Sequence, residues 1–140
     1  MAQPPKALTE FVSEAQEIID GLSKDLLRLG DQRVDPDPDL LNRVFRAAHS
    51  LKGLAGMFGV TRLAHLAHGA EDLLDDVRMG RVELGDDVLD LLLEAIEVMQ
   101  RMLAEVSGGE DGEATGGSGS QAENLAGRIA SMAAEGKLSH

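Results

Sequence analysis

His49 lies in a segment whose spacing keeps it apart from the apolar residues around it. On a helix, the apolar positions of this segment recur at three- and four-residue steps and form one buried face: Leu41, Val44, Phe45, Ala48, Leu51 and Ala55. Gly53 and Gly56 follow His49 one and two turns later. An exposed imidazole can act as a nucleophile, a proton carrier or a metal ligand, and a glycine inside a helix costs about 1 kcal/mol relative to alanine. The pattern predicts that the His49 ring needs clearance, with an ordinary surface histidine as the alternative.

A second group of residues could hold a metal ion. His65, His68 and Glu71 follow one another at three-residue steps, so one face of a helix could present them to a divalent cation. Carboxylate metal sites in helical bundles use Glu-x-x-His on two helices together with further Glu residues. Here the order is reversed and occurs once, so a metal-binding bundle is the less favoured hypothesis. The chain has no cysteine, which excludes disulfides and thiolate metal sites.

The helical period of the apolar residues indicates which elements carry these side chains. We expect four helices, over about residues 7–29, 38–56, 60–79 and 86–106. Gly30 is expected to end the first helix, Asp37 to cap the second, and Thr61 is the nearest capping side chain for the third. Residues 80–85 read as a loop.

Length and composition indicate how these helices assemble. The chain has 140 residues, is 43% hydrophobic and contains three Phe but neither Trp nor Tyr, which favours close-packed helices over a sheet. We predict an all-α fold in which residues 7–106 form an antiparallel up-down four-helix bundle. Residues 107–120 have the composition of a flexible linker. Residues 121–136 form a short fifth helix with a thin apolar stripe, which either docks on the bundle or stays separate.

The charge of the chain excludes several classes of partner. The net charge is −12, from 25 acidic and 13 basic side chains, so the surface would repel a nucleic-acid backbone. No apolar run approaches the roughly 20 residues that span a bilayer, and the N-terminus has no signal-peptide core. We therefore expect a soluble, cytoplasmic protein without a membrane partner. A phosphate-binding loop is also missing, so we expect no ATP site in this chain.

The segment 47–59 reads Ala-Ala-His-Ser-Leu-Lys-Gly-Leu-Ala-Gly-Met-Phe-Gly. It resembles the phosphoacceptor segment of the histidine phosphotransfer (HPt) domain that opens CheA-type chemotaxis histidine kinases. The resemblance covers about residues 8–106 and is strongest over 42–78. It implies that the ATP-binding domain of a kinase phosphorylates His49, and that the phosphoryl group then passes to an Asp of a response-regulator receiver domain. The domain would be a monomeric substrate and carrier without a cofactor of its own, because its partner domains hold ATP and Mg²⁺.

Antiparallel pairing relates the helix of His49 to the next one. With the turn centred near residue 58, His49 is level with His68, and Glu71 lies one turn further along. The rotation of the two helices cannot be read from the sequence. The resemblance supplies it, because the family pattern His-x-x-Glu is matched by His68 and Glu71, and Lys52 matches a lysine three residues after the acceptor.

The resemblance also implies roles for these residues. Glu71 would accept a hydrogen bond from Nδ1–H of His49 and so strengthen Nε2 as the nucleophile. Lys52 would offset the charge of the phosphoryl group, and His68 would orient Glu71 or donate to the phosphate. Gly53 and Gly56 would leave room for the approaching kinase or receiver domain. Each could instead be an ordinary surface residue, and the whole chain could be a non-catalytic helical interaction bundle.

Overall fold

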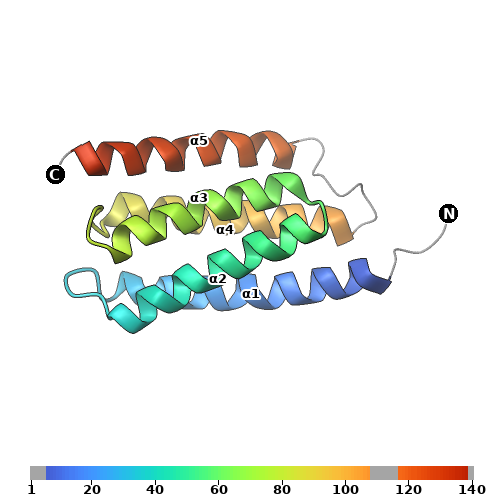
Figure 1. Ribbon diagram of the computed structural model, residues 1–140, viewed down its shortest axis with the longest axis horizontal. Helices are drawn as coiled ribbons and strands as arrows, with labels where there is room; N and C mark the ends of the chain where they lie inside the picture. Colours follow the sequence, from blue (N-terminus) through green and yellow to red (C-terminus); the bar gives the residue numbers. More distant parts are fainter. Residues whose placement is uncertain (1–5, 108–116, 139–140) are drawn as a thin grey trace.

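The computed structural model describes residues 6–107 and 117–138, and this part of the chain forms helices that run alternately in opposite directions (Figure 1). In chain order they are α1 (Lys6–Gly30), α2 (Pro38–Met57), α3 (Thr61–Arg78), α4 (Asp86–Ser107) and α5 (Gly117–Leu138). The first four agree with the predicted helices to within two residues at each end. The predicted all-α, antiparallel up-down bundle is confirmed.

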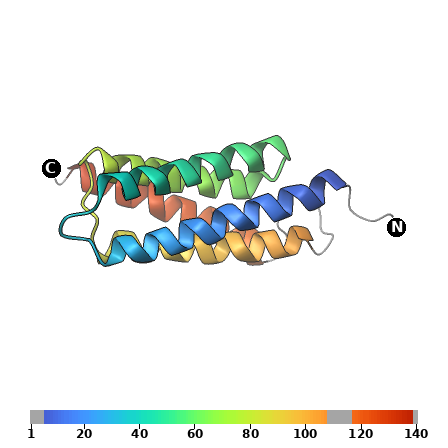
Figure 2. The same cartoon turned by 90° about the horizontal axis from the view of Figure 1, so that it is seen from below.

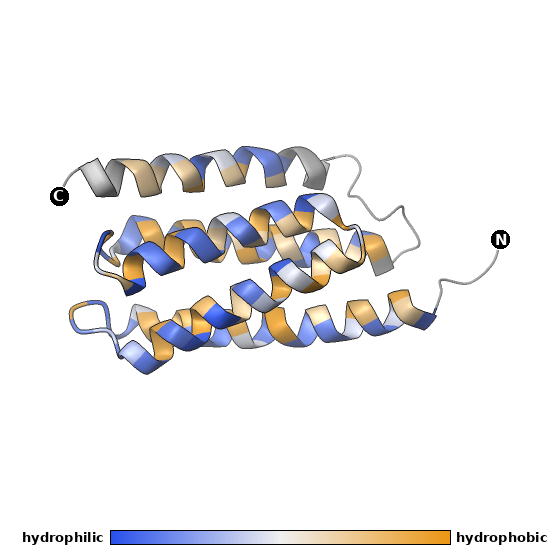
Figure 3. Ribbon diagram, viewed as in Figure 1, coloured by the Kyte–Doolittle hydropathy of each residue, from blue (hydrophilic) through white to orange (hydrophobic). Residues whose placement is uncertain are grey.

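The core lies where the apolar stripes of the helices meet. Helix α1 contacts α2 and α4, and α3 contacts α2, α4 and α5. Figure 3 shows hydrophobic positions turned toward neighbouring helices and hydrophilic ones toward the outside. The largest fully buried side chains are almost all aliphatic: Phe11, Ile19, Leu22, Leu26, Leu29, Leu51, Leu63, Leu66, Leu73, Leu74, Leu92 and Met99. Burying each such side chain contributes about 1.5–3 kcal/mol, so packing is the main source of stability.

Helix α4 is buried around more of its circumference than the sequence predicted. Leu89, Ile96 and Val106 are buried in addition to the eight residues that the helical period predicts to face the core, which are Val88, Leu91, Leu92, Ala95, Val98, Met99, Met102 and Leu103. Helix α4 contacts α1, α3 and α5, so more than one of its sides is covered. Among the described residues, no helix is both long enough and apolar enough to cross a membrane.

The start of α2 is fixed by its cap and by an ion pair with α1. The Asp37 side chain accepts a hydrogen bond from the Asp39 backbone N–H at 2.9 Å, with Pro38 in the first helical turn, as predicted. Arg43 donates to both carboxylate oxygens of Asp25, from Nε at 2.9 Å and Nη2 at 3.0 Å. These hydrogen bonds hold the pKa of Asp25 below its ordinary value despite partial burial. The cap therefore fixes where α2 begins, and the ion pair joins α2 to α1.

The turn between α2 and α3 is short and closed by backbone hydrogen bonds. The Val60 N–H donates to the Ala55 carbonyl at 2.9 Å, and the Gly59 N–H donates to the Gly56 carbonyl at 3.2 Å. This Schellman pattern needs a left-handed residue, and Gly59 supplies it with φ of +74°. The predicted turn is therefore confirmed, and it places α3 antiparallel to α2, as Figure 2 shows from a second side.

The predicted cap of α3 is wrong. Thr61 is the first residue of the helix, and its hydroxyl donates weakly to the Gly59 carbonyl at 3.4 Å. The cap position belongs to Val60, whose side chain has no oxygen to offer. Packing fixes this end of the hairpin instead, because the Phe58 ring lies 5.1 Å from the Phe11 ring of α1, centroid to centroid.

Helix α5 is longer than predicted and is docked on the bundle. It begins at Gly117, so residues 117–120 of the expected linker are helical, and residues 108–116 lie outside the described part. It packs on α3 and α4 through four buried side chains, Ala122, Leu125, Ile129 and Ala133. Arg128 also donates to Glu94 of α4, Nη1 to Oε2, at 3.0 Å. These contacts explain how a helix with a thin apolar stripe stays on the bundle.

Candidate functional site: a carboxylate-held histidine

His49 lies on α2 with its side chain 62% exposed, as predicted. Its Nδ1 atom is 2.5 Å from Oε2 of Glu71 on α3. An ionised carboxylate can only accept a hydrogen bond, so Nδ1 carries the proton and donates it. The tautomer leaves a lone pair on Nε2. The site therefore presents one basic nitrogen on a surface-exposed ring whose other nitrogen is held.

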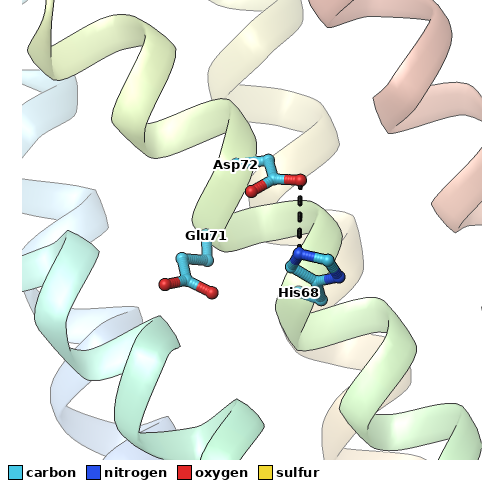
Figure 4. Close-up of side chains that lie close together, drawn as sticks. All are labelled: His68, Glu71 and Asp72. Carbon is cyan, nitrogen blue, oxygen red and sulfur yellow. Dashed lines mark ion pairs between the residues drawn. The ribbon is translucent and has the colours of Figure 1, made fainter.

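Glu71 is almost buried, although His68 and Asp72 beside it on α3 are exposed. Its side chain is 10% exposed, and Figure 4 shows its carboxylate turned toward α2. Burial by itself would raise the pKa of Glu71, but hydrogen bonds from Lys52 and His49 outweigh burial and leave the pKa below its ordinary value. Glu71 is consequently charged at neutral pH and is a strong acceptor for the Nδ1 proton.

Lys52 contacts the same carboxylate. Its Nζ atom lies 2.7 Å from Oε1 of Glu71, one turn beyond His49 on α2. In the unmodified protein the ammonium group therefore stabilises the buried carboxylate. Its predicted role in offsetting the charge of a phosphoryl group stays a prediction.

His68 does not contact Glu71 by a hydrogen bond in the described part of the chain. Its Nε2 atom is 3.5 Å from Oδ2 of Asp72, one turn along α3, and both side chains are exposed. In Figure 4 the His68–Asp72 pair and the Glu71 carboxylate point in different directions. The arrangement does not support an orienting role for His68 on Glu71, and a role as donor to a phosphate stays a prediction.

The structure separates the residues of the metal-site hypothesis. His65 lies near α5, with Nδ1 3.7 Å from Oε2 of Glu123. The group of ligand atoms that lie within 4.8 Å of one another belongs to His68, Glu71 and Asp72. A metal ion there would have to compete for Glu71 with His49 and Lys52, so the geometry favours a histidine held by Glu71 over a metal centre.

Two residues near the site were not anticipated. Phe45 was expected in the core but is half-buried, and its ring lies 6.4 Å from the His49 ring, centroid to centroid, at an interplanar angle of 24°. Asp76 of α3 is buried although it is a charged residue, and it accepts a hydrogen bond from Nε of Arg81 at 2.9 Å. The four-residue step from Phe45 to His49 was the one sequence signal for the first contact, whereas the burial of Asp76 depends on the path of the loop after α3.

The glycines beyond His49 border open space. Among the described residues, nothing outside the helix's own backbone lies within 4 Å of a Cβ atom added at Gly53 or at Gly56. Packing in this part of the chain therefore does not require glycine at either position. The predicted reason for these two glycines, clearance for a second molecule, stays a prediction.

We expect Gly53→Ala to raise the free energy of unfolding by about 0.5–1 kcal/mol, because alanine is the better helix former and no clash arises. Urea denaturation measures the change. Gly21→Ala is the matched control, since Gly21 is also an exposed helical glycine with nothing within 4 Å of an added Cβ.

A bulkier Gly53→Leu should then slow phosphate uptake by His49 if the space serves a partner. Unchanged uptake in that variant would contradict the clearance hypothesis.

An exposed histidine on a helical bundle, with its Nδ1 proton held by a carboxylate of the next helix, is an arrangement suited to accepting a phosphoryl group. The Hpt domain family matches residues 6–108. The match covers well over half of the chain, so this chain belongs to the Hpt domain family.

Known relatives refine this assignment. The chain is 40% identical over 104 residues to the chemotaxis protein CheA of Salmonella typhimurium. This match covers 74% of this chain and 15% of that protein. It is 32% identical to the solved CheA phosphotransferase domain from Thermotoga maritima, with a TM-score of 0.69, covering 75% of this chain and 98% of that one. The phosphorylated P1 domain of CheA3 from R. sphaeroides, solved in complex with CheY6, shares the fold with a TM-score of 0.79 at 24% identity, covering 91% of this chain and 95% of that one. The chain spans only about 15% of the length of the curated CheA relatives.

Proposed function

We propose that this domain is the phosphoacceptor and phosphocarrier of a CheA-type histidine kinase in chemotaxis signalling, with His49 as the acceptor. The observation that carries the proposal is the hydrogen bond of 2.5 Å between Nδ1 of the exposed His49 and the charged Glu71 carboxylate. It holds the ring in the tautomer that a nucleophile requires. Membership of the Hpt family and the CheA relatives support it independently.

The first step is attack on ATP. Nε2 of His49 uses its lone pair to form an N–P bond with the γ-phosphorus, while the bond from that phosphorus to the bridging oxygen breaks and ADP leaves. The ring then carries positive charge, with its proton retained on Nδ1. The Glu71 carboxylate stabilises this charge through the same hydrogen bond, and no proton needs to leave the site during the step.

The second step returns the domain to its starting state. A carboxylate oxygen of an Asp in a receiver domain attacks the phosphorus, the N–P bond breaks, and its electron pair returns to Nε2. We propose that ATP and Mg²⁺ are held by the kinase ATP-binding domain and the receiver domain, and that this domain is a monomeric carrier without catalysis of its own. The carrier would work in the cytoplasm, where ATP and response regulators are found.

The test is phosphate uptake from a CheA-type ATP-binding domain and radiolabelled ATP. We expect label that is stable in alkali and lost in acid, as for a phosphoramidate, with mass spectrometry of the peptide placing it on His49. Adding a receiver domain should then remove the label. A folded domain that stays unlabelled beside a kinase active on another HPt domain would overturn the proposal and favour a non-catalytic interaction bundle.

A further inference from the structure

The Phe45 ring is stacked with the imidazole of His49, whose Nδ1 edge is held by Glu71. Side chains on a helix lean toward its N-terminus, so the imidazole of His49 lies over the turn that carries Phe45. The two rings are nearly parallel, with an interplanar angle of 24° and centroids 6.4 Å apart, within the range of offset stacking. The contact is between two residues of α2 and needs no partner domain.

The Phe45 ring is itself held from α3. The Arg78 guanidinium carbon lies 4.2 Å from the centre of the Phe45 ring, a cation–π contact. Arg78 is in turn fixed by Asp75, with Nη2 and Nε at 2.5 and 3.2 Å from Oδ1, and by Oδ1 of Asn42 on α2 at 3.4 Å. The phenyl ring is thus held between the two helices that form the site.

We propose that Phe45, held in place by Arg78, is a positioning residue that sets the plane of the His49 imidazole. The inference rests on the proposed phosphoacceptor function of His49. The hydrogen bond at Nδ1 holds one edge of the ring, but the second side-chain torsion of His is broad, so the ring plane can still swing within the angular tolerance of that bond. A ring stacked on one face removes much of that freedom.

The restriction matters because the phosphoryl group must meet the lone pair of Nε2 in line with the departing ADP oxygen. Nε2 is not held by the Glu71 hydrogen bond, so a swing of the ring plane displaces its lone pair. Phe45 therefore acts through His49 and contacts neither ATP nor the Asp of the receiver domain. Its loss should lower the rate of the chemical step more than the affinity for the kinase.

The experiment compares Phe45→Leu, Phe45→Tyr and Phe58→Leu in the whole domain. Leucine keeps apolar bulk without a flat ring, and tyrosine restores the ring. Phe58→Leu is the matched control, since Phe58 is also a partly buried Phe near the end of α2 but packs on Phe11. Readouts are kcat and KM for phosphorylation, and the tautomer and line width of the His49 ring nitrogens in long-range ¹H–¹⁵N spectra, which need no kinase.

We expect Phe45→Leu to lower kcat about 3- to 10-fold at unchanged KM, a fraction of the roughly 100-fold that a misplacement of 1 Å can cost. The His49 nitrogen signals should broaden while Glu71 keeps the proton on Nδ1, and Phe45→Tyr should leave both readouts as in the wild type. Phe58→Leu should lower the melting temperature only. Wild-type kcat and unbroadened His49 nitrogen signals in a folded Phe45→Leu domain would overturn the inference, as would equal losses in the Leu and Tyr variants. Failure of the wild type to be labelled at all would instead count against the proposed function.

Discussion

Replacing His49 with glutamine is expected to abolish uptake of acid-labile phosphate while leaving the bundle folded. The side chain is 62% exposed, so its loss creates no cavity in the core. Glutamine can still donate an N–H to Glu71, but its amide nitrogen has no lone pair available for attack on phosphorus. The rate of labelling should fall to background, which is a larger loss than we expect from any other substitution in the site. Radiolabel from ATP, counted after gel separation, measures it.

His65→Gln is the matched control for this substitution. His65 has the same 62% exposure as His49 and lies one helix away, near Glu123 of α5. Circular dichroism and thermal melting should show both variants folded. Normal labelling of His65→Gln beside an unlabelled His49→Gln would identify His49 as the acceptor. Residual acid-labile label on folded His49→Gln would contradict the assignment and point to one of the remaining histidines.

Substitution of Glu71 is expected to have the second largest effect. Glu71→Ala removes the acceptor for Nδ1–H and leaves Lys52 without its partner, and we expect phosphorylation to slow about 100-fold, the upper range for losing a carboxylate that orients a functional histidine. Glu71→Gln keeps an oxygen acceptor but removes the charge that stabilises the phosphorylated ring. A loss of about 10-fold is therefore expected for glutamine. Single-turnover labelling with saturating kinase domain separates these rates from binding.

Asp72→Asn provides the control, because Asp72 is the next residue of α3 but is exposed and paired with His68. It should label at the wild-type rate. The spectra of the His49 ring nitrogens should change in both Glu71 variants and not in Asp72→Asn. Near-normal labelling of a folded Glu71→Ala domain would show that the hydrogen bond to Nδ1 is dispensable, and the mechanism given above would have to be abandoned.

The four-helix bundle could be predicted from sequence because each of its helices shows a regular apolar stripe and several helix ends carry a recognisable signal. Asp37 caps α2 and Gly59 ends the turn, as local chemistry requires. The extent of α5 could not be predicted in this way. Its first residues have the composition of a linker, and tertiary contact with α3 and α4 overrides a weak local preference. The absence of a side-chain cap from Thr61 could not be predicted either. A tertiary contact, the packing of Phe58 on Phe11, fixes that end of the hairpin.

The site could be predicted only in part. The exposure of His49 follows from the periodicity of α2. The length of the turn indicates which part of α3 lies opposite it. The contact with Glu71 depends on how far each helix is rotated about its axis, which no pattern within one helix records, and the family resemblance had to supply it. The pairing of Lys52 with Glu71 and of His68 with Asp72 depends on side-chain torsions. Those contacts could be seen only in three dimensions.

The closed turn over residues 58–60 has a consequence for how such a chain can vary in length. His49 and Glu71 lie on opposite arms of one hairpin, and their contact of 2.5 Å depends on the register that this turn sets. One inserted residue near the start of α3 would rotate the helix beyond it by about 100° and shift it by about 1.5 Å along its axis. Glu71 would then face away from α2. Insertions in the connections 31–37 and 79–85 would leave this pair untouched, so lineages of this domain are free to lengthen either of those two connections but not the turn beside the acceptor.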